Sequence, residues 1–378
     1  MPETTYRDRQ RRLVADVLKA GCDAILASNP STVRWLCGFA GSNGALLVAP
    51  AGSWFFTDGR YAQEAARMVS AGTVTECSVV SGSLPAALCS DGVFVQTAGN
   101  MAQTDGGALR MAFEADHVTV SSHNDLRTAM SGSDIRVALH PLVEAAAPLR
   151  AVKDDNEIDA MTRALRLSES VFGDVLSLVK EGVSERDLAA EIDYRQRVAG
   201  ASRSSFESIV AFGPNSARPH ARPGLDRLAP ATPILFDFGC EFDGYCSDMT
   251  RMVHLGRPSS EFLRIWSLVD AARRAAVESA VSGMSTHALD STARSVIQAE
   301  GYGNHFVHSL GHGLGMDVHE WPGVSARTDH RLQKNTVVTV EPGIYLEGQF
   351  GIRLEDTIVI TDGDARRLNR LSTEPVIL

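Results

Sequence analysis

The segment PILFDFGCEFDGYCSDMTR, residues 233–251, places two aspartates in a sequence typical of buried strands. Asp237 lies among aromatic and aliphatic residues, and Asp248 lies just before the sequence MTR. Carboxylates are costly to bury unless they are paired or bound to a cation. The segment therefore predicts a site that uses both aspartates.

Three residues nearer the C-terminus extend this pattern. Glu341 lies in VVTVEPGIY, Glu355 in GIRLEDTIVIT and His312 in HSLGHGLGMDVHEWP. An oxygen-rich set with a single imidazole suits hard or borderline divalent cations, and four acids favour a pair of them. Taken singly, each acid could be an ordinary strand end or turn residue. The five together, with their flanking sequences, favour a metal site.

Two hairpins would bring the acids together. With a turn over residues 241–244 (EFDG), Asp237 and Asp248 would be directly opposite, where cross-strand Cβ atoms are about 4.5–5.5 Å apart. Glu341 and Glu355 are symmetric about Gly348 and would face each other in a second hairpin, although a proline after Glu341 disturbs that ladder. Like charges repel at such separations, and a shared cation would remove the repulsion.

Four histidines accompany the predicted site: His308, His312, His319 and, upstream, His220. A lone histidine is more often structural than functional, but four beside a predicted metal site favour chemistry. His312 stands between glycines, where a backbone can approach a metal or substrate, and its imidazole would complete the ligand set. The other three are candidates to donate hydrogen bonds to a scissile carbonyl, an oxyanion or a terminal carboxylate.

The bulk composition is that of an ordinary globular protein. The chain has 378 residues, of which 44% are hydrophobic and 22% charged, and a formal net charge of −10. This charge argues against nucleic acid or an anionic membrane as a partner. The N-terminal sequence MPETTYRDRQRR lacks the apolar core of a signal peptide, and no apolar run approaches the ~20 residues of a membrane span. We therefore expect a cytoplasmic protein.

The length favours two domains, with a break near Pro148. Residues 1–148 alternate helical and strand patterns, which predicts an α/β domain. A helix is expected over residues 6–20, with strands in DAILAS, GSNGALLVA and SWFFTDG. Residues 91–107, rich in Gly, Ser and Asp, are not assigned.

The sequence pattern of residues 149–378 predicts an α+β domain whose strands carry the acids. Apolar residues recur at helical spacing over residues 259–281 and 286–300. Ser184 and Asp187 form the sequence of a capping box that opens another helix.

A resemblance to a known family rests on four segments: FDFGCEFDGYCSDMTR, FVHSLGHGLGMDVHEWPG, VVTVEPGIY and GIRLEDTIVIT. They are similar to the metal-binding segments of the pita-bread (M24-type) metallopeptidases, which include methionine aminopeptidases, aminopeptidase P, prolidases and creatinases. The similarity runs from about Val152 to the C-terminus, with all five ligand positions in order. It implies an α+β pita-bread catalytic domain with a pseudo-twofold sheet, preceded by a smaller α/β creatinase-type domain.

The first half adds a second resemblance. WLCGFAGSNGALLV and WFFTDGRYAQEA are similar to parts of bacterial Xaa-Pro aminopeptidases and related prolidase-like enzymes. Methionine aminopeptidases usually lack such a domain, and creatinases lack the full metal set. In relatives this domain shapes access to the site, often across a dimer. The resemblance therefore implies a homodimer in which residues 1–148 contribute substrate access and dimer contacts.

The family further implies two divalent metal ions per chain, most often Mn²⁺, with Co²⁺ or Zn²⁺ as alternatives, that share a water or hydroxide. Asp237 would chelate one ion, and Asp248 and Glu355 would bridge both. His312 and Glu341 would complete the shell of the other ion. Glu341 would also carry a proton to the leaving nitrogen.

The resemblance assigns the remaining site residues to the substrate side. His220 and His319 would contact the scissile bond and stabilise the oxyanion, and His308 would line the proline pocket. Arg353 would support the neighbouring ligand Glu355 through an ion pair, with Tyr345 as a further candidate beside it. The acidic site would also attract the free α-amine of a peptide near Asp237.

The leading functional prediction is an Xaa-Pro aminopeptidase, a metal-dependent exopeptidase that removes the first residue from peptides whose second residue is proline. The segments GFAGSNG and TDGRY favour this reading. The nearest alternative is an Xaa-Pro dipeptidase (prolidase) restricted to dipeptides. An alternative from another class is a metal-free binding or scaffold protein on the same fold, and a third is a relative acting on a non-peptide substrate.

Overall fold

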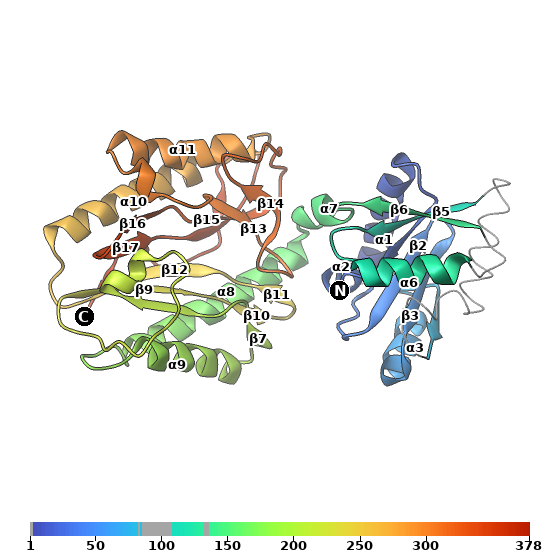
Figure 1. Cartoon of the computed structure of the whole chain (residues 1–378), viewed down its shortest axis with the longest axis horizontal. Coiled ribbons are helices and arrows are strands. Elements are labelled where there is room, and N and C mark those ends of the chain that lie inside the picture. Colours follow the sequence, from blue (N-terminus) through green and yellow to red (C-terminus); the bar gives the residue numbers. More distant parts are fainter. Residues whose placement is uncertain (1–2, 82–83, 85–107, 132–135) are drawn as a thin grey trace. The chain divides into compact units, whose positions relative to one another are not determined.

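The computed structural model describes residues 3–81, 84, 108–131 and 136–378 of the chain. These residues form two compact units, Met1–Arg150 and Ala151–Leu378, drawn in Figure 1 and called here the N-terminal and C-terminal units. The unassigned stretch 91–107 lies outside the described residues.

A six-stranded mixed sheet, in the order β4-β3-β2-β1-β5-β6, is the centre of the described N-terminal unit. β2 is antiparallel to β1 and β3, whereas β4, β5 and β6 each pair in parallel. The three expected strands correspond to β1, β2 and β3, and the α/β expectation is confirmed. The strands are β1 (Ala24–Ala27), β2 (Gly44–Ala49), β3 (Gly52–Thr57), β4 (Glu76–Val79), β5 (Leu109–Glu114) and β6 (Val137–Leu142). The helices are α1 (Glu3–Lys19), α2 (Pro30–Cys37), α3 (Ala62–Ser70), α6 (Val120–Ser131) and α7 (Ala147–Ala151).

The C-terminal unit repeats one plan twice: a helix pair followed by strands. α8 (Asp155–Leu176) and α9 (Glu185–Val198) precede the first set of strands, and α10 (Ser260–Ser279) and α11 (Thr286–Ala299) precede the second. The two pairs lie on opposite sides of the strands (Figure 1). This arrangement is the pita-bread fold with its pseudo-twofold sheet, as expected.

The strands of the C-terminal unit fall into several sheets. The main ones have the orders β20-β12-β9-β8 and β14-β13-β15-β18-β19, with a smaller sheet β11-β10-β7 and a ribbon β16-β17. The first set is β7 (Arg203–Ser204), β8 (Ile209–Phe212), β9 (Thr232–Phe238), β10 (Cys240–Phe242), β11 (Tyr245–Cys246) and β12 (Met249–Leu255). The second set is β13 (Gly311–Gly313), β14 (Glu320–Val324), β15 (Val337–Val340), β16 (Gly343–Leu346), β17 (Phe350–Arg353), β18 (Asp356–Val359), β19 (Arg366–Arg367) and β20 (Val376–Ile377).

Side-chain caps fix the starts of the long helices. The Ser184 hydroxyl accepts from the Asp187 amide while the Asp187 carboxylate accepts from the Ser184 amide, so the predicted capping box of α9 is confirmed. Asp154 and Glu157 make the same reciprocal contacts at α8. Capped in this way, the helices bury their apolar faces against the strands: Phe172 of α8 meets Phe236 of β9 edge-on, with ring centroids 5.6 Å apart.

The first hairpin departs from its predicted register. Its turn consists of Asp243 and Gly244, with φ of 51° and 83°, because Phe242 pairs with Tyr245. Two residues with positive φ match the twist of the flanking strands, and Asp-Gly is a preferred sequence for them. Asp237 is therefore opposite Thr250, and the prediction that it directly opposes Asp248 was wrong.

The second hairpin keeps its predicted register. Val340 pairs with Asp356 and Gly343 with Arg353, so Glu341 and Glu355 occupy facing positions between these two pairs. The chain changes from β15–β18 pairing to the β16–β17 ribbon at this point. Pro342 has no N–H to continue the ladder there, which matches the interruption.

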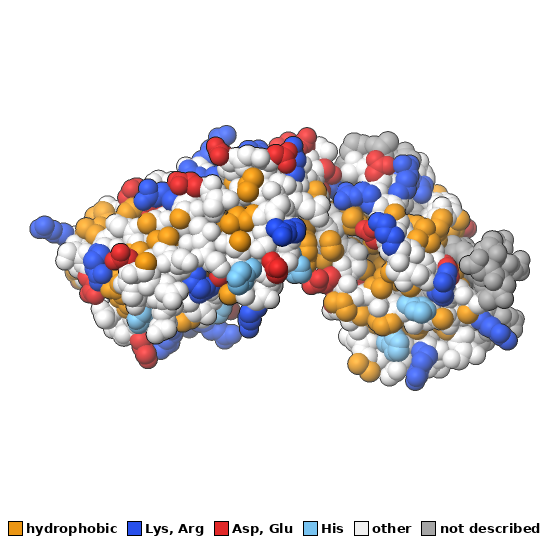
Figure 2. All heavy atoms as spheres, turned by 90° about the horizontal axis from the view of Figure 1, so that it is seen from above, with side chains coloured by type: hydrophobic (Ala, Val, Ile, Leu, Met, Phe, Trp, Pro, Cys, Tyr) orange, Lys and Arg blue, Asp and Glu red, His pale blue; other side chains and the backbone are white. Residues whose placement is uncertain are grey.

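The surface of the C-terminal unit is mixed in charge. On the face shown in Figure 2, acidic and basic side chains are interspersed over this unit. Among the described residues, no helix combines the length and apolar character that a membrane crossing requires.

Candidate metal centre and pocket

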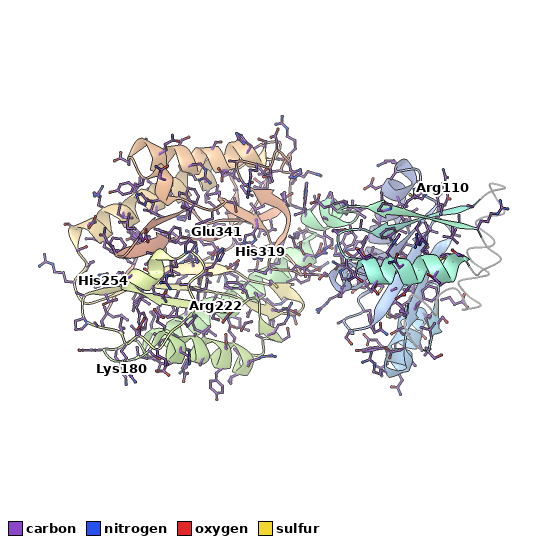
Figure 3. The ribbon with its side chains drawn as sticks, in the orientation of Figure 1. Arg110, Lys180, Arg222, His254, His319 and Glu341 are labelled. Atoms are coloured by element: carbon purple, nitrogen blue, oxygen red, sulfur yellow. The ribbon has the colours of Figure 1, made fainter. Side chains whose placement is uncertain are left out.

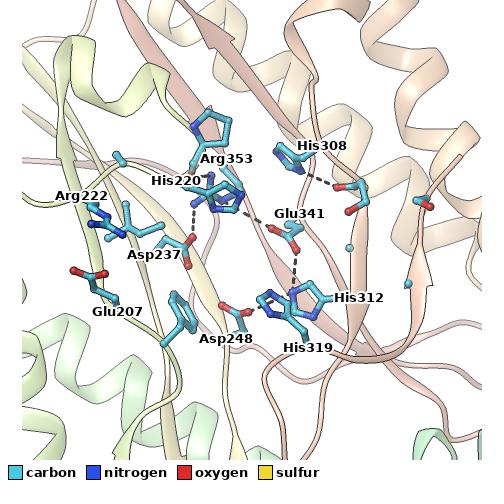
Figure 4. Close-up of a pocket in the computed structure, with 18 of the residues that line it drawn as sticks. Glu207, His220, Arg222, Asp237, Asp248, His308, His312, His319, Glu341 and Arg353 are labelled. Atoms are coloured by element: carbon cyan, nitrogen blue, oxygen red, sulfur yellow. Dashed lines mark hydrogen bonds and ion pairs between the residues drawn. The ribbon is translucent and has the colours of Figure 1, made fainter. Parts of the chain in front are cut away.

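A pocket of about 630 Å³ in the C-terminal unit collects the predicted residues. Eight of the ten line it: His220, Asp237, Asp248, His308, His312, His319, Glu341 and Arg353. Glu355 and Tyr345 are buried behind this lining. In Figure 4 the aspartates lie on one wall, and His308, His312 and His319 lie with Glu341 on the other. His254, which was not assigned to the site, lies at the far end of β12 (Figure 3).

Three carboxylates form the centre of the site. Ligand atoms of Asp237, Asp248 and Glu355 all lie within 4.8 Å of one another, and all three residues are buried. Burial, together with the charges of Glu355 and Asp237, raises the pKa of Asp248 well above its usual range. Burial and the charges of Glu341 and Asp237 likewise raise the pKa of Glu355. Such a cluster is unfavourable in its ionised form unless a cation is shared.

His312 directs its Nε2 atom at this cluster. Its Nδ1 lies 3.0 Å from the carbonyl oxygen of Gly313, which can only accept, so Nδ1 carries a proton. Nε2 lies 3.3 Å from Glu341 Oε1 and 3.6 Å from Asp248 Oδ2. Backbone fixation of one ring nitrogen is how metal-binding histidines are commonly oriented. His312 thus offers Nε2 to an ion held between the two acids.

Glu341 is ionised over the physiological range. Burial alone would raise its pKa, but the hydrogen bond and charge of His312, with His308 and Arg353 nearby, lower it to about 2. The Thr339 hydroxyl donates to Glu341 Oε1 at 3.1 Å and accepts from the His312 amide at 3.1 Å. One threonine therefore holds both of these residues in place.

Two buried oxygens indicate where cations fit. Asp237 Oδ1 and Glu355 Oε1 have no hydrogen-bond partner among the described residues. Buried polar atoms are normally satisfied, so orphaned acceptors call for an explanation. Clustered carboxylates, two orphaned oxygens and an imidazole nitrogen directed at them are the donor set of a divalent-metal centre. The residues present therefore fit the metal ions that the sequence implies.

Arg353 pairs with a different acid from the one predicted. Its Nη2 forms an ion pair with Asp237, and its Nε lies 4.0 Å from Glu341. The expected ion pair with Glu355 is not formed, because Thr250 lies between them. The Thr250 hydroxyl accepts from Arg353 Nε at 3.2 Å and donates to Glu355 Oε2 at 3.0 Å.

His308 and Tyr345 belong to the same network. His308 Nδ1 donates to the Ser309 carbonyl at 2.7 Å, and Nε2 lies 2.8 Å from the Tyr345 hydroxyl. Burial lowers the pKa of His308 to about 4, so its ring is neutral and Nε2 accepts from the tyrosine. Arg353 in turn donates to that hydroxyl at 2.6 Å. Both nitrogens of His308 are engaged, so it has no N–H left to donate to a substrate, in contrast to the expectation that it is such a donor, although it does line the pocket.

His319 is the better placed donor. Its ring meets that of His312 edge-on, with centroids 4.4 Å apart. Burial and the neighbouring His312 lower the pKa of His319, which keeps it neutral at pH 7 with one N–H to donate. His220 enters the pocket from the opposite side, next to Arg353 in Figure 4.

The glycines on either side of His312 allow β13 to pack closely against its neighbouring strands. A Cβ on Gly311 would lie 2.0 Å from the Thr339 carbonyl oxygen, and one on Gly313 would lie 2.4 Å from that of Trp321. β13 is pressed between β14 and β15 at these points. The close approach expected here is thus to neighbouring strands, and it sets the position of His312 within the sheet.

Replacement of Gly311 by Ala is therefore expected to destabilise the protein by at least about 2 kcal/mol, as overpacked cores do, and to lower activity by displacing His312. Gly363 is a matched control, because a Cβ there meets nothing within 4 Å. Urea unfolding and a peptidase assay on both variants measure the difference. Equal stability of the two variants would contradict this account of Gly311.

Sequence reasoning missed Thr250 and Thr339. Each stands two residues from a ligand, Thr250 after Asp248 and Thr339 before Glu341, and side chains at that spacing share one face of a strand. That spacing was the available signal. The pocket lining also includes Phe206, Glu207, Arg222 and Arg327, for which the sequence offered none.

Both units of the chain match known protein families. The model of metallopeptidase family M24 matches residues 159–362, and that of the Creatinase/Prolidase N-terminal domain matches residues 9–152. The uncharacterized peptidase YqhT of Bacillus subtilis is 34% identical over 358 residues, covering 95% of this chain and 96% of that protein.

Solved structures give the same picture. The Xaa-Pro dipeptidase from Bacillus anthracis superposes with a TM-score of 0.88 and 31% identity, covering 99% of this chain and 100% of that one. The X-Pro aminopeptidase from Thermotoga maritima superposes with a TM-score of 0.83 and 32% identity, covering 98% and 100%. The similarity in fold therefore extends over the whole length of each chain.

Proposed function

This chain belongs to metallopeptidase family M24, and from that premise we propose that it is an Xaa-Pro dipeptidase, which splits dipeptides whose second residue is proline. The observation that supports the proposal is the cluster of three buried carboxylates beside His312 and Glu341 at one pocket. The dipeptidase from Bacillus anthracis, with its TM-score of 0.88, supports this over the aminopeptidase that the sequence first favoured.

We assign the five ligands to two divalent cations, as the family implies. Asp237, Asp248 and Glu355 would hold them on one side, and His312 with Glu341 on the other. When bound, such cations make a nucleophilic water available near neutral pH and polarise the scissile carbonyl.

The other residues have roles that follow from their protonation. Glu341, whose carboxylate is ionised and lines the pocket, can accept a proton from the attacking water and pass it to the proline nitrogen as that nitrogen leaves. Neutral His319 can donate its N–H to the oxyanion. His308, held by Ser309 and Tyr345, would pack against the proline ring. The ion pair between Arg353 and Asp237 orients that ligand and partly offsets the effect of burial, which raises the pKa of Asp237.

An Xaa-Pro aminopeptidase is the second candidate. The Thermotoga maritima structure, with a TM-score of 0.83, and the volume of the pocket, about 630 Å³, favour it, because such a volume leaves space for a longer peptide. The two candidates share their chemistry and differ in the length of peptide they accept.

Activity on Ala-Pro and Ala-Pro-Ala, each with and without Mn²⁺, separates these functions. The dipeptidase proposal expects at least tenfold higher kcat/KM for Ala-Pro, which corresponds to about 1.4 kcal/mol of discrimination. Equal turnover of the tripeptide would favour the aminopeptidase. Met-Ala-Ser tests the need for proline, and N-acetylated Ala-Pro tests recognition of the free amine. Absence of metal-dependent cleavage from the whole panel would leave the scaffold alternative.

A further inference from the structure

The ligands of the metal centre come from two halves of the C-terminal unit, the first set of strands with its helix pair and the second set with its own. Among the described strands these halves are joined by the β12–β20 ladder, which does not include Glu355. Asp237 is the penultimate residue of β9, and Asp248 precedes β12 of the same sheet, whereas Glu355 lies between β17 and β18. Among the described strands, β12 shares no sheet with β17 or β18. The three carboxylates nevertheless lie within 4.8 Å of one another. A contact other than backbone pairing must fix Glu355 against the two aspartates.

Arg251 makes one such contact, in addition to those of Thr250 and Arg353. Its Nη1 donates to the carbonyl oxygen of Thr250, at 2.9 Å, and to that of Glu355, which is 104 residues away in the chain. The two carbonyls belong to the two halves, and one nitrogen holds both. The side chains on the same two residues meet as well, because the Thr250 hydroxyl donates to Glu355 Oε2 at 3.0 Å.

Asp356 anchors this arginine from behind. Its Oδ1 lies 3.3 Å from Arg251 Nη2, and its Oδ2 accepts from Nη1 of Arg273 on α10. Arg251 Nη2 also donates to the Leu371 carbonyl at 3.0 Å. The side chains of Arg251 and Asp356 are 2% and 0% exposed. An arginine buried this deeply, with its donors spread over three chain segments, has one available orientation.

We propose that Arg251, anchored by Asp356, is a positioning residue that holds Glu355 against Thr250 and so sets Glu355 at the distance from Asp237 and Asp248 that metal binding requires. The inference rests on the metal centre of the proposed function. A planar guanidinium can donate to both carbonyls, to Leu371 and to Asp356 at once. A lysine ammonium keeps the charge but cannot span these acceptors, so Arg251→Lys isolates the geometry from the charge.

Calorimetric titration of metal-free protein with Mn²⁺ tests the proposal. Arg251→Lys is expected to weaken metal binding about ten- to a hundredfold, the usual effect of removing a group that orients a ligand. With Mn²⁺ in excess, kcat should recover towards the wild-type value and KM for Ala-Pro should change little, because the arginine does not line the pocket. A purely structural role would lower the melting temperature and leave the metal affinity of the folded variant unchanged.

Arg367→Met is the matched control. Arg367 lies 3.6 Å from the same carboxylate of Asp356, but its side chain is 40% exposed and, among the described residues, it forms no hydrogen bond with Thr250 or Glu355. Its loss should therefore leave metal affinity within about twofold of the wild-type value. Asp356→Asn keeps the shape of the anchor and should weaken metal binding several-fold.

The metal affinities of these variants decide whether Arg251 positions Glu355. Folded Arg251→Lys with wild-type metal affinity, or Arg367→Met with an equal loss, overturns the proposal. If Arg251→Lys does not fold, Asp356→Asn decides in its place: weakened binding supports the proposal and unchanged binding overturns it. Failure of the wild-type protein to bind Mn²⁺ would instead overturn the proposed metal centre itself, together with this inference.

Discussion

Replacement of Asp248 by Asn is expected to lower kcat/KM by at least ~10³-fold, which is about 4 kcal/mol of transition-state stabilisation. Asp248 belongs to the cluster of three acids and its Oδ2 also lies 3.6 Å from His312 Nε2, so its loss removes a carboxylate that faces both sides of the ligand set. Asparagine has the same shape but carries no charge, so the pocket keeps its form. Steady-state kinetics on Ala-Pro with excess Mn²⁺ measure the loss.

The same variant should be no less stable than the wild type when both are metal-free. Burial and the charges of Glu355 and Asp237 raise the pKa of Asp248, so its ionised form is repelled in the folded protein. Removal of that charge relieves the repulsion. Melting temperatures in EDTA at pH 8 give the comparison. Retained activity would refute Asp248 as a ligand, and a lower melting temperature would refute the electrostatic account.

Removal of metal from the wild-type protein is expected to abolish peptidase activity and lower thermal stability. A ligand at about 100 times its Kd stabilises the folded state by about 2.7 kcal/mol. For a unit the size of the C-terminal one this corresponds to roughly 5–10 °C in melting temperature. Calorimetry of EDTA-treated protein with and without Mn²⁺ measures the shift, and Asp248→Asn is the control that should show little of it.

The stabilisation by Mn²⁺ should also grow as the pH rises. The pKa values of Asp237, Asp248 and Glu355 are raised, chiefly by burial. Their contribution to stability is complete below the ordinary carboxyl pKa of about 4 and is lost as the pH rises through the raised values. The pKa of His312 is raised through its hydrogen bond and charge interaction with Glu341, against the effect of burial, and it acts in the same direction.

Glu341 does not oppose this trend. Its pKa is lowered to about 2, so its contribution is lost only as the pH falls towards that value. Metal-free protein should therefore melt at a lower temperature at pH 8 than at pH 5, and the increment on adding Mn²⁺ should be larger at pH 8. An increment independent of pH would contradict the raised pKa values.

The sequence predicted those parts of the molecule that depend on local patterns. Helix periodicity, the Ser184 capping box and the symmetry of Glu341 and Glu355 about Gly348 all have counterparts in the structure. These features are set by residues close in the chain. The second hairpin kept its predicted register because the pairs on both sides of Pro342, Val340 with Asp356 and Gly343 with Arg353, are symmetric about the same residue, Gly348.

The predicted register of the first hairpin and the predicted ion-pair partner of Arg353 were both wrong. The turn was centred one residue position too early because EFDG was treated as a four-residue unit, although Asp243-Gly244 alone satisfies the two positive φ values. The partner of Arg353 was misassigned because Asp237 and Thr250 come from another hairpin, more than 100 residues away in the chain. Spacing within one segment carries no information on such contacts.

The division of the ligands between two halves has a consequence for the kinetics of folding. Arg353 and Asp237 are 116 residues apart in the chain, so the centre exists only after both halves have docked. Contacts of such long range form late, because loop closure opposes them until the rest is in place. Metal ions should therefore bind after the transition state, slowing unfolding while leaving the refolding rate nearly unchanged. Manganese would then extend the lifetime of the folded enzyme without helping it to form.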